Sequence, residues 1–360
     1  MFIKKNEVKI ALNICTYQRE EYIHRNLSLL RASYFFDWRK TDYYGKLHIF
    51  IVDNARKLKI REDEYTHLVY NKNTGGSGGF QRGIEEIRKQ KGFTHVIFMD
   101  DDVVFDINSF YLLFDFLTQV DEENRDRPVA GRMFCMDRPN IQYTAAEKWN
   151  GGNISHVEFL RDVRKSVYAP GKVVYDADAD YGGWWFCCFP IEFVLHNDVL
   201  PFFIHCDDVE YGLRCGRKPI IIEGVQVWHE TYDKRMTPLM QYYDTRNPLF
   251  VNQIYGFLPE TEQVMEAWKQ KITEYHVRKD WLTEYYVILA MNDFLKGMRW
   301  LKRINAERYH RKLQRARSSK LKNAVCWRVV TLKFRIKKFI KAKICLLYTS
   351  PSPRDRSVSR

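Results

Sequence analysis

The chain has 360 residues, of which 45% are hydrophobic and 15% aromatic, enough to bury the core of one large domain with an appendage or of two domains. No stretch approaches the roughly 20 apolar residues of a membrane-spanning helix, and the first apolar run leads into Thr16–Arg19 without a cleavage site, which argues against a signal peptide. The net charge of +13 comes from residues 296–345, which carry +17, whereas residues 1–295 carry −6. Eight cysteines without framework spacing indicate reduced thiols in a cytosolic protein.

Short apolar runs alternate with helical patterns in the N-terminal hundred residues. Val8–Cys15, Leu47–Val52 and His95–Met99 are rich in Ile, Val and Phe and are predicted to form buried strands. Glu20–Ala32 has apolar residues at helical spacing, and a glycine-rich loop precedes a second predicted helix at Phe80–Gln90. This alternation predicts a parallel sheet built from βαβ units.

Polar residues follow each of these predicted strands directly. Thr16–Arg19 follow the first strand, Asp53 and Asn54 the second, and Asp100–Asp102 the third. Ligands of parallel α/β sheets bind at the carboxyl ends of the strands. We therefore expect these residues to meet in one site.

The triplet Asp100–Asp102 indicates a metal site. Three adjacent carboxylates repel one another and are costly to desolvate unless a positive charge compensates them. Their hard oxygen ligands suit Mg²⁺ or Mn²⁺, particularly where phosphate oxygens complete the shell. In an extended segment Asp100 and Asp102 point to the same side, so these two are the expected metal or nucleotide ligands. A solvated acidic loop or helix N-terminus is the alternative.

The glycine-rich segment Asn71–Gly83 is a weak indication of phosphate binding. Glycines allow a backbone to approach a ligand closely, and a helix N-terminus favours anions. The segment lacks the Gly-Lys-Ser/Thr end of an ATPase loop, and it follows a later strand than the dinucleotide fingerprint requires. Both differences argue against ATPase and NAD-dependent functions. A helix-capping turn is the alternative.

Two later segments add candidate site residues. Asp207 and Asp208 end an apolar run and enter a predicted helix, where a carboxylate can act as general base or simply cap the helix. His229 ends another apolar run and is able to complete a metal shell. A zinc site is the alternative, and it would use His205, Cys206, Cys215 and His229. The spacing of these four residues matches no zinc pattern.

The C-terminal part of the chain is predicted to be helical and basic. Residues 262–345 have helical patterns, and from Val325 to Ile344 apolar residues at three- and four-residue steps alternate with Lys and Arg. This pattern predicts a basic amphipathic helix, with an ordinary packed helix as the alternative. Residues 346–360 are rich in Ser, Pro and Arg without a pattern, and we interpret them as a non-native or disordered tail.

In this order the elements resemble the family 2 glycosyltransferases of the GT-A fold, and among them the bacterial galactofuranosyltransferase-like branch. The segments that carry the resemblance are Thr16–Arg19, Asp53-Asn54, Asn73–Phe80, Asp100–Asp102, Gly182–Trp185, Asp207–Arg214, Trp228-His229 and Tyr242–Asn247. Each segment is weak alone, but the ordered set is specific. The resemblance implies an α/β fold with a mostly parallel sheet flanked by helices. It implies a catalytic domain at residues 1–258, followed by the helical basic region 259–345.

The resemblance also implies roles for the matching residues. The donor nucleotide-sugar would be bound by Arg19, Asp53, Asn73, Gly75, Gly76, Asp100 and Asp101. The divalent metal, Mn²⁺ or Mg²⁺, would be held by Asp100, Asp102 and His229. The general base would be Asp208, and the acceptor would be bound by Trp184, Trp185 and Asp207, with core packing as an equal alternative for the tryptophans.

The activity implied is inverting, metal-dependent transfer of a sugar, galactofuranose from UDP-galactofuranose, onto a cell-surface glycan or lipid-linked acceptor. Two departures leave the exact sugar and processivity open: Asp244 stands where the family carries a histidine, and catalytic-type sequence starts by Val8, where larger members have an N-terminal β-rich domain. A dTDP-rhamnose-dependent rhamnosyltransferase is the nearest alternative. The basic segment 296–345 suits an anionic inner membrane leaflet, which predicts a cytoplasmic protein peripheral on the membrane. Nucleic-acid binding by the same segment is the non-enzymatic alternative, and a binding module without activity is a third.

Overall fold

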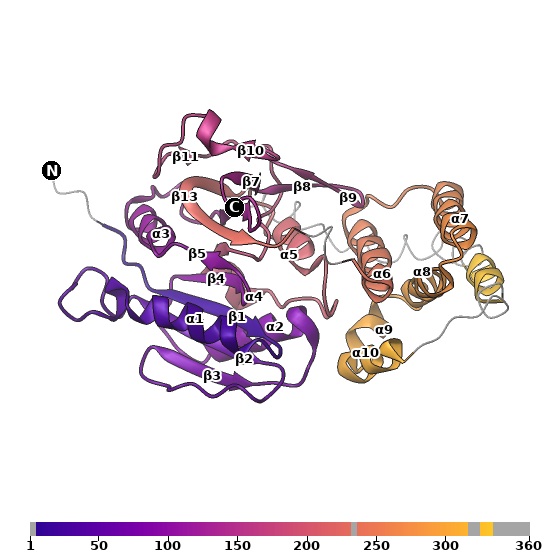
Figure 1. Cartoon of the computed structure of the whole chain (residues 1–360), viewed down its shortest axis with the longest axis horizontal. Helices are drawn as coiled ribbons and strands as arrows, with labels where there is room; N and C mark the ends of the chain where they lie inside the picture. The colour runs from indigo at the N-terminus through magenta and orange to yellow at the C-terminus, as the bar shows by residue number, and fades with distance from the viewer. Residues whose placement is uncertain (1–4, 232–235, 316–324, 334–360) are drawn as a thin grey trace, which may run out of the picture. The chain divides into compact units, whose positions relative to one another are not determined.

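The computed structural model describes residues 5–231, 236–315 and 325–333, which include the elements drawn in Figure 1. The strands are β1 (Ile10–Thr16), β2 (Leu47–Asp53), β3 (Thr66–Tyr70), β4 (His95–Asp100), β5 (Val104–Phe105), β6 (Val129–Cys135), β7 (Ile141–Thr144), β8 (Glu147–Asn150), β9 (Asn153–His156), β10 (Arg161–Asp162), β11 (Val173–Val174), β12 (Cys187–Pro190) and β13 (Ile220–His229). The helices are α1 (Glu20–Arg31), α2 (Gly75–Ile87), α3 (Asn108–Gln119), α4 (Ile191–His196), α5 (Asp207–Cys215), α6 (Pro238–Tyr255), α7 (Thr261–Val277), α8 (Trp281–Phe294), α9 (Met298–Arg303) and α10 (Ala306–Gln314), with 3₁₀ turns η1 (Tyr34–Phe36) and η2 (Val163–Lys165).

These elements form two compact units. Of the described residues, the first unit comprises 5–149, 154–203 and 207–231, and the second comprises 150–153, 204–206, 236–315 and 325–333. The expected domain boundary at residue 258 stays a prediction.

The first unit is built on one large sheet. Its strand order is β10-β7-β6-β12-β4-β1-β2-β3, and β13 joins at β6. Strands β3, β2, β1 and β4 pair in parallel, β12 runs antiparallel between β4 and β6, and β13 is parallel to β6. The carboxyl ends of β1, β2, β4, β6 and β13 therefore face the same way. This arrangement confirms the predicted α/β fold with a mostly parallel sheet.

Helices cover both faces of this sheet. Because the side chains of a strand alternate between its faces, one strand contributes to a core on each side. On β1, Ile10, Leu12 and Ile14 pack into a core cluster that includes apolar residues of α1 and α3. The intervening Ala11 packs into a second cluster, together with Phe80 and other residues of α2, α4 and α5. The strands are buried on both faces, which is why they read as continuous apolar runs.

Two features of the N-terminal half differ from the sequence-based expectation. The short, partly exposed strand β3 (Thr66–Tyr70) was not predicted, since its five residues lack a continuous apolar run. The predicted glycine-rich loop is instead largely helical, because α2 extends from Gly75 to Ile87 and so includes most of the segment Asn71–Gly83. Packing of Phe80, Ile84 and Ile87 stabilises a helix that its five glycines disfavour by propensity.

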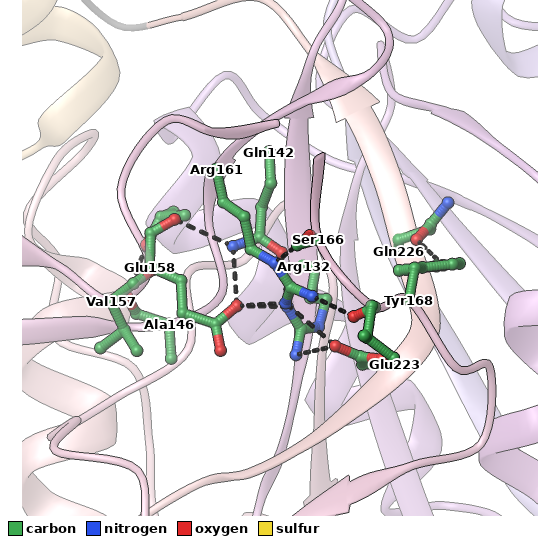
Figure 2. A network of polar contacts seen from close by, with 12 residues as sticks. Arg132, Gln142, Ala146, Val157, Glu158, Arg161, Ser166, Tyr168, Glu223 and Gln226 are labelled. Atoms are coloured by element: carbon green, nitrogen blue, oxygen red, sulfur yellow. Dashed lines mark hydrogen bonds and ion pairs between the residues drawn. The ribbon is translucent and has the colours of Figure 1, made fainter. Parts of the chain in front are cut away.

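A buried polar network joins β6 and β13 to the segment after β9 (Figure 2). Arg132 on β6 is fully buried, and its Nη1 donates to Glu158 Oε2 at 2.8 Å and to Gln142. Arg161 Nη1 donates to Glu158 Oε2 at 2.8 Å and to Glu223 Oε1 at 2.9 Å. Burial alone would raise the pKa of Glu158, but the charge of Arg132 and hydrogen bonds from both arginines lower it to about 2. Two positive and two negative side chains thus compensate one another, with Arg132 and Glu223 buried and Glu158 partly exposed to solvent.

From Pro238 onward, the described part of the second unit is mainly helical. On α6, Thr237 caps the N-terminus through its side chain and Gly256 ends the helix with φ of 75°. Tyr242 on α6 donates to Asp293 Oδ2 on α8 at 2.7 Å, which ties the two helices together. Of the predicted basic helix Val325–Ile344, only residues 325–333 lie within the described residues. Among residues 5–231, 236–315 and 325–333, no helix has the length and apolar composition needed to cross a bilayer.

Candidate functional site: acidic groups at the carboxyl edge of the sheet

Three predicted metal ligands come together in the first unit. Strand β4 ends at Asp100, a turn follows through Asp102, and β13 ends at His229. Because β4 and β13 run in the same direction, their carboxyl ends bring these residues to one edge of the sheet. One ligand atom from each of Asp100, Asp102 and His229 lies within 4.8 Å of the others. His229 Nε2 is 3.1 Å from Asp102 Oδ1 and 3.7 Å from Asp100 Oδ2.

This cluster fits a divalent cation. Two carboxylates and one imidazole are a donor set that suits Mn²⁺ or Mg²⁺ with phosphate or water oxygens in the remaining positions. Asp102 and His229 are buried, whereas the Asp100 side chain is 40% exposed, which leaves one side of the cluster open to a ligand. The alternative of a solvated acidic loop does not account for the burial of Asp102.

Arg19 lies beside the acidic triplet at the start of α1. Its Nη1 is 2.7 Å from Asp101 Oδ1 and 2.9 Å from Asp102 Oδ2. Burial raises the pKa of Asp101, and the charge of Arg19 partly opposes that rise. Asp100 and Asp102 therefore belong to the cluster with His229, and Arg19 pairs with both Asp101 and Asp102. A role of Arg19 and Asp101 in donor binding stays a prediction.

The remaining predicted donor residues hold loops at the same edge. The buried Asp53 carboxylate accepts backbone N–H groups of Ala55, Lys57 and Leu58 at 2.6–2.7 Å, which shapes the loop after β2. Asn73 Oδ1 accepts from Gly75 N at 3.2 Å, just before α2. Direct contact of these residues with a nucleotide stays a prediction.

The glycines at the start of α2 allow close packing of the backbone as well as a left-handed backbone conformation. Gly75 has φ of +74°, and a Cβ placed on it would lie 2.0 Å from the carbonyl oxygen of Phe203. A Cβ on Gly76 would lie 3.9 Å from Asp207 Oδ2. The sequence pattern pointed to phosphate here, whereas the structure also places the segment against the chain that leads into α5.

Asp207 and Asp208 form the first turn of α5, as the sequence predicted. Ser77 Oγ donates to Asp207 Oδ2 at 2.9 Å. Burial raises the pKa of Asp208 well above its usual value, and the charges of Asp207, Glu147 and Asp100 raise it further. A carboxyl group with a raised pKa near other acids is a candidate for proton transfer.

The backbone before α5 is strained. Phe203, His205 and Cys206 have φ of 78°, 65° and 64°, in the left-handed region that non-glycine residues avoid. Such strain costs about 1–3 kcal/mol per residue and is concentrated at functional sites. No sequence pattern predicted it.

The two tryptophans of the predicted acceptor site have different surroundings. Trp184 is only 4% exposed and stacks on Phe98 with ring centroids 4.7 Å apart. Trp185 is half-buried, and its Nε1 donates to the Gly131 carbonyl at 2.7 Å. Trp184 is thus part of the core, the alternative weighed for it above. Acceptor binding by Trp184, Trp185 and Asp207 stays a prediction.

Two residues near Asp208 and Asp207 were missed by sequence reasoning. Glu147 on β8 is buried; its Oε2 accepts from Tyr181 Oη at 2.6 Å, and its Oε1 lies 2.9 Å from His156 Nδ1. It stands in a short alternating segment that resembles an ordinary edge strand. Ser77 had a weak signal, since it is the single residue with a side chain in Gly75–Gly79.

The mostly parallel sheet, with an acidic metal-type cluster at its carboxyl edge and an acidic pair entering α5, is the arrangement expected of a GT-A glycosyltransferase. Residues 12–174 match the family model described as Glycosyl transferase family 2. Over residues 12–174 the chain is therefore similar to the glycosyltransferase family 2 domain.

Two curated relatives are similar to part of the chain. Both are named galactofuranosyltransferase GlfT2: that of Mycolicibacterium smegmatis is 26% identical over 242 residues, and that of Mycobacterium tuberculosis is 26% identical over 248 residues. Each match covers 62% of this chain and 37% or 38% of the relative. The chain thus spans little more than a third of the length of these relatives.

Among solved structures, similar chains include GalNAc-T7 with UDP, GalNAc and Mn²⁺, at a TM-score of 0.46 and 12% identity over 69% of this chain and 48% of that chain. The mannosyltransferase PcManGT of Pyrobaculum calidifontis, in complex with GDP-Man and Mn²⁺, has a TM-score of 0.41 and 11% identity over 92% of this chain and 87% of that chain.

Proposed function

We propose that the protein is an inverting, metal-dependent transferase of a hexose from a nucleoside diphosphate donor to a hydroxyl of a cell-surface glycan or lipid-linked acceptor. The observation that carries the proposal is the convergence of Asp100, Asp102 and His229 at the edge of the sheet. The 26% identical relatives named galactofuranosyltransferase support UDP-galactofuranose as donor. A rhamnosyl donor, dTDP-rhamnose, is the second candidate.

The mechanism follows from charge placement. A divalent cation held by Asp100, Asp102 and His229 would neutralise charge that develops on the departing diphosphate. Arg19 would add a positive charge on the same side. Asp208 would take the proton of the acceptor hydroxyl as its oxygen bonds to the anomeric carbon and the bond to the diphosphate oxygen breaks. Attack opposite the leaving group inverts the anomeric configuration.

The donor is tested by turnover of the full chain with UDP-galactofuranose, dTDP-rhamnose and UDP-glucose, each with Mn²⁺ and with chelator. We expect the highest kcat/KM with UDP-galactofuranose and loss of turnover with chelator. A preference for dTDP-rhamnose would replace the proposed sugar, and absence of turnover with every donor would contradict the proposed reaction.

The metal site is tested by Asp102→Ala. Loss of a buried carboxylate of the cluster is expected to weaken binding of UDP in the presence of Mn²⁺ by at least about 10–100-fold, the loss that follows even from changing a residue that hydrogen-bonds to a metal ligand. Titration calorimetry with and without Mn²⁺ measures this. Asp121→Ala, which removes an exposed carboxylate after α3, is the matched control and should bind as the wild type does. Unchanged Mn²⁺-dependent affinity in Asp102→Ala would contradict the assignment.

We also propose a cytoplasmic protein that docks on an anionic membrane surface through the basic residues 296–345, which carry +17. Each basic residue near such a surface contributes about 1 kcal/mol. The full chain is expected to float with anionic vesicles at low salt and not with neutral vesicles. Equal flotation with both would refute electrostatic docking. A salt-sensitive shift of an oligonucleotide together with no flotation would favour the nucleic-acid alternative.

A further inference from the structure

The N-terminal turn of α2 is packed against the residues that lead into α5. Gly75 allows the Phe203 carbonyl oxygen to approach to a position that a Cβ would occupy. The backbone N–H of Ser77 then donates to that same oxygen at 3.2 Å. Phe203 itself has φ of 78°. The turn of α2 therefore holds the chain where its backbone is strained.

The Ser77 side chain extends this contact to the acidic pair. Its hydroxyl is fully buried and donates to Asp207 Oδ2 at 2.9 Å. Hydrogen bonds to ionised acceptors are stronger and more directional than those between neutral groups. Ser77 thus contacts both Phe203 and Asp207, on either side of the left-handed residues His205 and Cys206.

We propose that Ser77 is a positioning residue for the general base. By holding Asp207, it sets the orientation of the first turn of α5, and with it the carboxylate of the adjacent Asp208. The inference rests on the proposed function, because it takes Asp208 as the base. It extends that function because the glycine-rich segment would also position the base that deprotonates the acceptor hydroxyl.

Packing alone does not explain a serine at this position. The flanking Gly76 and Gly78 need no side chain, and a buried site that only had to be filled would accept alanine, which is smaller and favours helix more strongly. A buried hydroxyl is costly unless it is hydrogen-bonded. Here the hydrogen bond to the carboxylate of Asp207 compensates the cost of burying the Ser77 hydroxyl.

The test is Ser77→Ala in the full chain, with Ser109→Ala as matched control. Ser109 is equally buried at the start of α3, and its hydroxyl donates to the carbonyl groups of Gly224 and Gln226. We expect Ser77→Ala to lower kcat about 10-fold, since a misplaced catalytic group costs one to two orders of magnitude, while donor KM and UDP affinity stay within about 3-fold. Ser109→Ala should lower the thermal midpoint without this selective loss of kcat.

A double-variant cycle separates positioning from general destabilisation. If Ser77 acts through the base, Ser77→Ala should lower kcat little further in an Asp208→Asn background. Should Ser77→Ala fail to fold, Ser77→Cys, a weaker donor of similar shape, is expected to have an intermediate kcat. Wild-type kcat in a folded Ser77 variant, or the full additional loss in the double variant, would overturn the inference. A wild-type rate in Asp208→Asn alone would instead contradict the proposed base, and the inference with it.

Discussion

Asp208→Asn is expected to lower kcat by about 10²–10⁴-fold, the usual contribution of a general base. The amide keeps the shape of the side chain but does not take a proton from the acceptor hydroxyl. UDP affinity in the presence of Mn²⁺ should change little, because the proposed donor and metal groups are Arg19 and the cluster of Asp100, Asp102 and His229, not Asp208. Initial rates at saturating donor, together with calorimetry, measure both quantities.

The pH dependence of the wild type checks the same assignment. Burial, followed by the charge of Asp207, raises the pKa of Asp208 above its usual value. A base must be ionised to act, so kcat should fall as pH drops through this raised pKa, earlier than for an ordinary carboxylate. Asp198→Asn, which alters a surface acid paired with Arg88, is the matched control and should keep the wild-type profile. A rate near that of the wild type in Asp208→Asn would remove Asp208 from the mechanism.

Arg132→Met is expected to lower the free energy of unfolding by about 3–5 kcal/mol, the cost of breaking a buried ion pair by removing one partner. Arg132 is fully buried, with Glu158 at 2.8 Å and Glu223 at 3.7 Å. Methionine fills similar space but leaves these carboxylates with Arg161 as their remaining cation in the network of Figure 2. Denaturant unfolding of the full chain measures the loss.

A second variant separates charge from volume. Arg132→Met combined with Glu158→Gln removes one positive and one negative charge, and should recover part of the stability lost by Arg132→Met alone. The pair Arg125 and Glu122, exposed and 3.2 Å apart, is the control: Arg125→Met should cost within about 1 kcal/mol. An Arg132→Met loss as small as that of Arg125→Met would show that the network contributes no stability.

Periodicity predicted the elements whose burial is uniform. β1, β2 and β4 lie where continuous apolar runs placed them, because strands covered on both faces need apolar side chains at every position. β3 was not predicted because its five residues alternate irregularly between buried and partly exposed, and so form no continuous apolar run. The start of α2 was missed because glycines have a low helix propensity. Packing in the folded protein stabilises the helix in spite of that low propensity.

For the site, the sequence by itself determined the candidate residues: the acidic triplet, the acidic pair and the histidine are polar residues that directly follow apolar runs. It also implied that they meet, because parallel strands end at a common edge. Only the tertiary structure decided their contacts, with Arg19 paired to Asp101 and Asp102, and Asp102 also beside His229. It alone decided the contact of Ser77 with Asp207, 130 positions apart. Such contacts depend on side-chain packing between distant segments, which local sequence patterns do not encode.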